Sequence, residues 1–175
     1  MAYRTKTYIA GDWTGDSNLI EGLRRWNASS QWDLSYSDAH ELTQARDTSL
    51  PCSIKRSLRE RLDESKTFVL IVGNHTKDLT KGGCKHCGSY SVHGGCHRYH
   101  SVDHRSFIEY ECEYATEHGL KIVVLYNGCS VMRDRCPEVL RNRGAHLAAV
   151  FKGADGKLFW DVEGIAEALR GKPWW

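Results

Sequence analysis

The chain has 175 residues, enough for one domain with a sizeable core, and its 41% hydrophobic and 26% charged residues are ordinary for a globular protein. A formal net charge of +2 at pH 7 is too small to indicate a nucleic-acid partner. No apolar run approaches the roughly 20 residues that span a bilayer, and the first residues lack the apolar core of a signal peptide. We therefore expect a single cytoplasmic domain over residues 1–175, with no membrane partner and with its seven cysteines reduced or bound to metal.

Apolar spacing predicts that strands and helices alternate along the chain. In chain order we expect a strand over 7–10, a helix over 19–26, a strand over 32–36, a long polar loop over 37–49, a helix from Pro51, a strand over 68–72, a helix around Glu111, a strand over 122–126, a short helix over 137–143, strands over 147–151 and 157–160 around a turn, and a helix over 162–169. The run over 68–72 is apolar on both faces, as in a central parallel strand. This order predicts an α/β fold with a mainly parallel sheet of about five strands and helices on both faces.

Ligands of such sheets bind beyond the carboxyl ends of the strands, so we expect the loops after the first three strands to line a site. These loops carry Gly11, Asp12, Trp13, Ser37, Asp38, Asn74 and Thr76. The sequence has neither the GxGxxG of dinucleotide-binding folds nor the GxxxxGK[ST] of P-loop proteins, and no GxSxG elbow. These three common classes of enzyme are therefore disfavoured.

A single acid, Glu111, falls inside the apolar stripe of the helix expected near residues 106–115. At about 100° per residue, Phe107, Ile108 and Cys112 share its face, while Glu109, Glu113 and Glu117 follow one another on the opposite side. Burying a carboxylate is costly unless it has a partner or its pKa rises. Glu111 is therefore a candidate for chemistry. The alternative, that it pairs with a buried Arg or caps a loop, stays open.

A Cys/His-rich insertion over residues 80–102 has the pattern C-x₂-C-x₈-C-x₃-H. Thiolate and imidazole groups at these spacings suit tetrahedral zinc. We predict a structural zinc site, with a free, flexible cysteine-rich loop as the alternative. The candidate ligands are Cys84, Cys87, Cys96 and His100, with Cys112 as an alternative fourth ligand.

Four segments together resemble the TIR-like, ThsB-like proteins of bacterial Thoeris anti-phage systems. They are the glycine and acid at 11–12, the loop from Tyr36 to Asp47, the strand and loop over 68–76, and the stretch from Phe107 to Glu111. In that family an aromatic residue commonly precedes the catalytic glutamate by four positions, as Phe107 precedes Glu111. The resemblance covers roughly residues 5 to 126.

The resemblance implies a flavodoxin-like TIR fold with NAD as the substrate and Glu111 as the catalytic residue. The reaction would break the nicotinamide–ribose bond and make an ADP-ribose-derived signal nucleotide, either a cyclic ADP-ribose isomer or an ADP-ribose conjugate. A separate effector protein would respond to that product, and a phage-derived trigger and self-association are further expected partners. The substrate-binding set comprises Gly11, Asp12, Trp13, Ser37, Asp38, His40, Arg46, Asn74, Thr76 and Phe107.

Several alternatives stay open at this point. A tryptophan near a glycine, such as Trp13, more often has a packing role. Asp12 could equally cap the next helix, and the loop with His40 and Arg46 could equally be solvated. Because a fold does not fix a function, a catalytically silent TIR-type interaction module is the second hypothesis. A zinc-stabilised nucleic-acid binder that uses the basic residues of 81–105 ranks last, because the rest of the chain offers no matching basic face.

Overall fold

A parallel sheet of four strands, in the order β1-β2-β5-β6, forms the centre of the computed structural model, which describes residues 5–32, 34, 36–37 and 50–171. The strands are β1 (Lys6–Ala10), β2 (Ser65–Val72), β5 (Lys121–Tyr126) and β6 (Ala145–Ala148). Phe68 of β2 pairs with Tyr8 of β1 on one side and with Ile122 of β5 on the other. The two central strands are buried along almost their whole length, which explains why their sequences are apolar on both faces.

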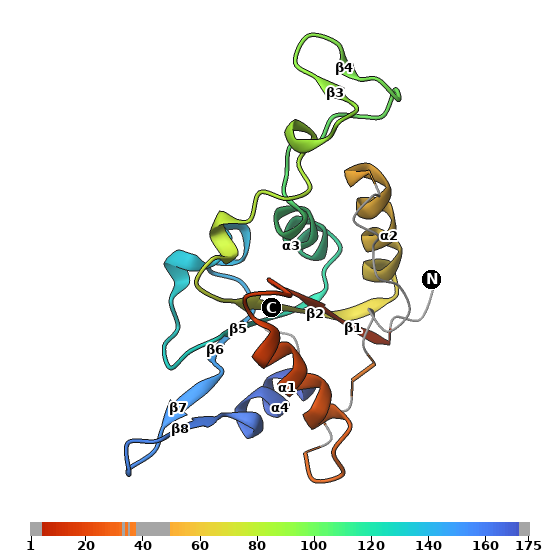
Figure 1. Ribbon diagram of the computed structural model, residues 1–175. Helices are drawn as coiled ribbons and strands as arrows, with labels where there is room; N and C mark the ends of the chain where they lie inside the picture. The colour runs from red at the N-terminus through yellow and green to blue at the C-terminus, as the bar shows by residue number, and fades with distance from the viewer. Residues whose placement is uncertain (1–4, 33, 35, 38–49, 172–175) are drawn as a thin grey trace.

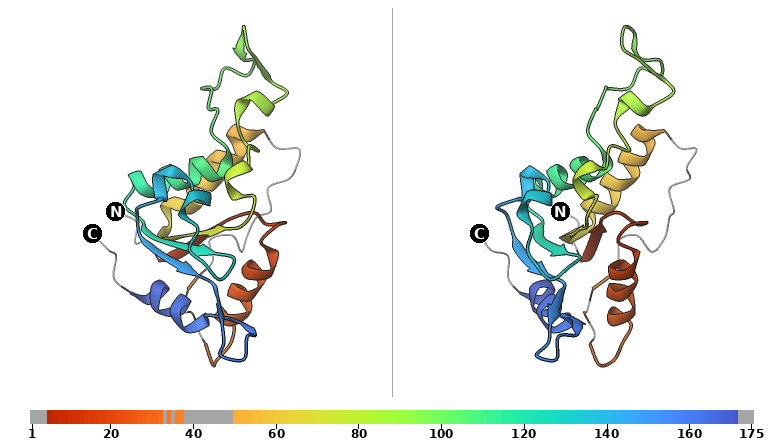
Figure 2. Two further views of the ribbon diagram at one scale, coloured as in Figure 1. Left: turned by 90° about the vertical axis from the view of Figure 1, so that its left-hand side faces the viewer. Right: turned by 60° about the vertical axis from the view of Figure 1, so that its left-hand side comes forward.

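Helices cover both faces of the sheet (Figures 1 and 2). α1 (Ser17–Asn27) and α4 (Val162–Arg170) lie on one face, and α2 (Pro51–Asp63) and α3 (Phe107–Glu117) lie on the other. Each face has its own apolar core. The structure thus confirms the predicted α/β fold. Of the helices in the described part of the chain, none is long and apolar enough to cross a membrane.

The segment expected to form a fifth strand, over 32–36, has no strand assigned at the positions that the structure describes there. Residues 33 and 35 lie outside those positions. The N–H of Thr7 donates to the carbonyl of Ser37 at 2.7 Å, and the side chain of Asn27 bonds the backbone of Tyr36 in both directions. Ser37 therefore lies beside the outer edge of β1, and Tyr36 lies beside the end of α1.

The second half of the chain differs from the prediction in detail. The helix expected over 137–143 is shorter than predicted and consists of the single 3₁₀ turn η4 (Glu138–Leu140). Another 3₁₀ turn, η3 (Arg133–Arg135), precedes it. The chain has to enter β6 at Ala145, which leaves little room for a longer helix. The turn at 155–156 joins β7 (Val150–Lys152) to β8 (Leu158–Trp160). These two strands pair only with each other and form a hairpin separate from the main sheet.

The Cys/His-rich insertion leaves the body of the molecule between η1 (Thr76–Asp78) and α3 (Figure 1). It contains η2 (Cys84–His86) and the short antiparallel pair of β3 (Tyr90–Ser91) with β4 (Gly95–Cys96). We call residues 83–103 the finger.

Candidate functional site

The carboxylate of Glu111 lies in the interior, between α3 and the edge strand β1. Its side chain is 6% exposed, and it accepts a hydrogen bond from the hydroxyl of the fully buried Tyr8. Ile108 and Cys112 beside it are also buried, whereas Glu117 is exposed. The structure thus confirms the inward position predicted from helical spacing. The partner of Glu111 is a tyrosine on a distant strand, which the sequence did not reveal.

Burial raises the pKa of Glu111 to about 7, although the hydrogen bond from Tyr8 and the charge of Arg61 both act to lower it. The pKa of Tyr8 is raised well above its ordinary value, first by burial and then by the negative charge of Glu111. The Tyr8 hydroxyl therefore keeps its proton and donates it to the hydrogen bond. Near neutral pH, Glu111 exchanges between its acid and its carboxylate. Such a pKa is typical of catalytic acids and bases, and buried structural pairs also produce it.

We expect Tyr8→Phe to raise the pKa of Glu111 above 7, because the lost hydrogen bond stabilises the ionised form. The pKa can be measured by NMR titration of the ¹³C-labelled Glu111 carboxyl, assigned by its absence in Glu111→Gln. Tyr90→Phe, in the finger, is the matched control and should leave the titration unchanged. An equal pKa in wild type and Tyr8→Phe would contradict the role of this hydroxyl.

The start of α3 is fixed by a capping box. The Ser106 hydroxyl accepts the N–H of Glu109 at 3.2 Å, and the Ser106 N–H donates to the Glu109 carboxylate at 2.7 Å. The two bonds satisfy backbone N–H groups that a helix otherwise leaves unpaired at its first turn. Glu111 therefore lies on a helix whose first residue is well defined.

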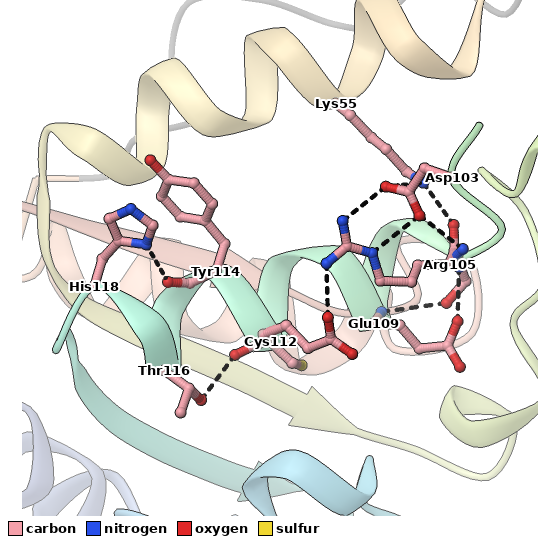
Figure 3. Close-up of polar contacts among 10 residues, drawn as sticks. Lys55, Asp103, Arg105, Glu109, Cys112, Tyr114, Thr116 and His118 are labelled. Carbon is pink, nitrogen blue, oxygen red and sulfur yellow. Dashed lines mark hydrogen bonds and ion pairs between the residues drawn. The ribbon is translucent and has the colours of Figure 1, made fainter. Parts of the chain in front are cut away.

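An ion network holds the chain just before α3 against α2 (Figure 3). Asp103 accepts two hydrogen bonds of 2.9 Å from the Arg105 guanidinium and lies 3.1 Å from the Lys55 ammonium. Arg105 also donates to Glu113 at 2.6 Å, and Lys55 donates to the Arg105 carbonyl at 2.7 Å. Burial acts to raise the pKa of Asp103, but the hydrogen bonds from Arg105 and Lys55 outweigh it and hold that pKa well below its ordinary range.

A second polar cluster lies at the carboxyl ends of β1, β2 and β5. Asp16, which is 3% exposed, accepts a hydrogen bond of 2.8 Å from the Asn127 side chain through Oδ1, and its Oδ2 has no hydrogen-bond partner within the described ranges. A Cβ at Gly73 would collide with this carboxylate, so the end of β2 needs a glycine there. Burial raises the pKa of Asp16, against the lowering effect of the Asn127 hydrogen bond.

This cluster lies where the topology predicts a ligand. The chain passes from β1 to α1 on one face of the sheet, and from the neighbouring β2 to α3 on the other face. Ligands of open α/β sheets bind at such a divergence of connections. An acid just before a helix is ordinarily a helix cap, so the sequence did not distinguish Asp16, yet its side chain caps no α1 N–H group.

A hollow of about 400 Å³ begins next to this cluster, at Asn18, whose carbonyl oxygen accepts from Asn127 at 3.0 Å. Its other lining residues are Glu21, Arg25 and Trp160. The hollow lies on the α1 face of the sheet, whereas Glu111 lies on the α3 face.

The residues predicted after β1 have three different surroundings. Gly11 is buried against Ile71, where an added Cβ would lie 3.1 Å from the isoleucine Cβ. Asp12 accepts the N–H of Thr14 at 3.0 Å, so it stabilises a turn and does not cap α1. Trp13 is 41% exposed, and the Arg24 guanidinium lies over its ring, 5.0 Å from the centroid.

Of the other predicted binding residues, Asn74 and Thr76 follow the carboxyl end of β2, whereas Ser37 lies beside the first half of β1, away from that edge. Asn74 is exposed and accepts a hydrogen bond of 2.6 Å from Arg135, whereas Thr76 is buried and accepts the N–H of Gly73 at 2.8 Å. Phe107 packs at the rim of the α2–α3 core, and the carbonyl of Ser37 is bonded to β1. Asp38, His40 and Arg46 lie outside the described residues.

The predicted zinc ligands fall into two places. Cys84, Cys87, Cys96 and His100 all lie in the finger, whereas Cys112 is fully buried in the core beneath α3. Over the ranges that the structure describes, no three Cys, His, Asp or Glu side chains are gathered as a metal site requires. The zinc site therefore stays a prediction.

Residues 8–81 match the family model described as Thoeris protein ThsB, TIR-like domain. No curated protein matches the chain. The matched segment begins within β1, at Tyr8, and contains α1, α2 and β2, together with Asp16. It ends just before the finger, so α3 and Glu111 lie outside it.

Proposed function

The chain belongs to the ThsB-like TIR-domain proteins of Thoeris defence, and from this premise we propose that it cleaves NAD at the nicotinamide–ribose bond. The product is an ADP-ribose-derived signal nucleotide that activates an effector protein. The observation that carries the proposal is Glu111, a lone carboxylate buried on α3 whose pKa is raised to about 7.

The chemistry requires a negative charge beside the ribose. Breaking the bond between the ribose carbon and the nicotinamide nitrogen builds positive charge on the ribose in the transition state, as in glycoside hydrolysis. A carboxylate fixed in surroundings of low dielectric stabilises that charge far better than water does. Nicotinamide leaves as a neutral molecule, so one carboxylate suffices without a general acid. The ribose carbon then bonds a nucleophile of the same molecule or of another one, which loses a proton.

Tyr8 and α3 supply the positioning in this proposal. The hydroxyl of Tyr8 orients the carboxylate of Glu111 and favours its ionised form. Because Glu111 is buried, α3 must move relative to β1 before the ribose can reach it. We assign this opening to self-association or to a phage-derived trigger. Basal activity of the isolated chain is accordingly expected to be low.

The test is to incubate the purified protein with NAD, with and without extract of phage-infected cells, and to separate the products by chromatography with mass detection. Nicotinamide together with an ADP-ribose-derived product would support the proposal and identify the signal. Extract without the protein is the control for other NAD-consuming enzymes. Intact NAD under every condition would contradict the proposal.

The second candidate function is a catalytically silent interaction module. The observation that favours it is an exposed aromatic pair on the β7–β8 hairpin, where Phe151 and Phe159 stack with ring centroids 5.7 Å apart. Exposed apolar surface of this kind is typical of protein contacts. In that case the bond between Tyr8 and Glu111 has a structural role, and NAD remains intact in the experiment above.

A further inference from the structure

The backbone of the finger is joined by hydrogen bonds, but the finger lacks an apolar core. Neither of the two cores of the described chain contains a finger residue. Its large side chains Val92 and Tyr99 are exposed, the latter to 98%. So short a segment ordinarily needs a disulfide or a metal to hold one conformation. All of its cysteines are free thiols in this structure.

Backbone hydrogen bonds arrange the finger as two antiparallel legs. At the base, the N–H of Cys84 donates to the carbonyl of Asp103 at 2.9 Å. Further out, the N–H of His97 donates to the carbonyl of Ser89 at 2.8 Å, and Tyr90 pairs with Cys96. Paired strands lie only about 5 Å apart, so side chains on one leg can reach those on the other.

Each leg presents its potential ligands on a tight turn. On the outgoing leg, the N–H of Cys87 donates to the carbonyl of Cys84 at 2.9 Å, so these two cysteines begin and end one turn. On the returning leg, the N–H of Tyr99 donates to the carbonyl of Cys96 at 2.9 Å. Tyr99 has a φ of +58°, a left-handed conformation that is rare for a tyrosine and that directs the chain into His100. The C-x₂-C and C-x₃-H halves of the sequence pattern thus lie on facing legs.

The sulfur of Cys84 is already hydrogen-bonded as a metal-bound thiolate would be. The N–H of Asp103 donates to Cys84 Sγ at 3.2 Å. Hydrogen bonds of this kind orient a ligating group and stabilise its charge. Asp103 itself is fixed by Lys55 and Arg105. The position of Cys84, the proposed ligand, is therefore fixed relative to the body of the molecule.

We propose that the finger binds one Zn²⁺ through the thiolates of Cys84, Cys87 and Cys96 and the imidazole of His100. Binding releases the three thiol protons and closes the two legs around the ion. In this structure the four side chains are not gathered as a metal site requires, so the two legs must come closer together when the ion binds. Four protein ligands leave no open position, so the zinc is structural. The site does not depend on the reaction proposed for Glu111.

The first test measures metal in the intact protein. We expect one zinc per chain after purification without chelators, and a tetrahedral cobalt spectrum with thiolate charge-transfer bands after exchange with Co²⁺. Cys84→Ser, Cys87→Ser and Cys96→Ser should each weaken zinc binding by more than the roughly 10- to 100-fold cost of losing a group that is hydrogen-bonded to a ligand. Cys52→Ser and Cys129→Ser are the matched controls, because these free thiols lie outside the finger, and they should keep one zinc per chain.

The second test concerns the fourth ligand and the fold. His100→Ala should lose the tetrahedral cobalt spectrum, whereas His97→Ala should keep it. Circular dichroism should show an unchanged body in all finger variants, because the two cores contain none of the changed residues. A chain that takes up no zinc even when reduced, or a zinc content that survives Cys84→Ser with Cys96→Ser, would overturn the proposal.

Discussion

Glu111→Gln is expected to lower the rate of NAD cleavage by at least about 100-fold, the usual cost of removing one fixed group that stabilises transition-state charge. The amide has nearly the same size and can still accept the hydrogen bond from Tyr8, but it carries no negative charge. The measurement is NAD loss and nicotinamide release under the conditions in which wild type is active. Glu117→Gln is the matched control, because Glu117 is exposed on the same helix, and it should retain wild-type activity.

The stability of the same variant separates a catalytic from a structural role. The folded-state pKa of Glu111 is raised from 4.5 to about 7, so the folded protein binds more protons than the unfolded chain between these values. The stability of wild type therefore falls as pH rises through this window, by up to about 3 kcal/mol. Glutamine has no such loss, so the Tm of Glu111→Gln should not be below that of wild type at pH 8. A large drop in Tm would show that the carboxylate is needed for folding.

Asp103→Ala is expected to destabilise the protein by about 2–3 kcal/mol, because it leaves the ammonium of the buried Lys55 without its counter-charge. Arg105 loses its partner as well, although Glu113 still binds it. The free energy of unfolding can be measured by urea titration. Asp103 has a folded pKa below its unfolded value, so its contribution is present above pH 4 and is lost as the pH falls below that.

Two further variants test the cause of this loss. Glu64→Ala breaks the more exposed pair with Lys6 and should change stability by less than about 1 kcal/mol. Adding Lys55→Met to Asp103→Ala should restore part of the stability, because the unpaired buried charge is removed. If Asp103→Ala were as mild as Glu64→Ala, the network would have no special role at the start of α3.

The sequence predicted those features that depend on local pattern. The apolar run of β2 and the helical spacing around Glu111 are periodic, so both elements and the inward direction of the carboxylate followed from them. Tyr8 and Glu111 are 103 positions apart, and Asp16 and Asn127 are 111 positions apart. No periodicity connects such pairs, because they meet only after the sheet has formed. For the same reason the sequence showed an acid inside an apolar stripe but not its partner.

The two ends of the finger lie side by side, joined by the bonds between Cys84 and Asp103. A segment of this kind can be lengthened, shortened or exchanged without any change in the spacing of β2 and α3. The entropic cost of closing a loop grows only slowly with its length, so a longer or shorter finger should change the stability of the body very little. The strands and helices of the body therefore do not depend on the length or the sequence of the finger, which is attached to them at one place.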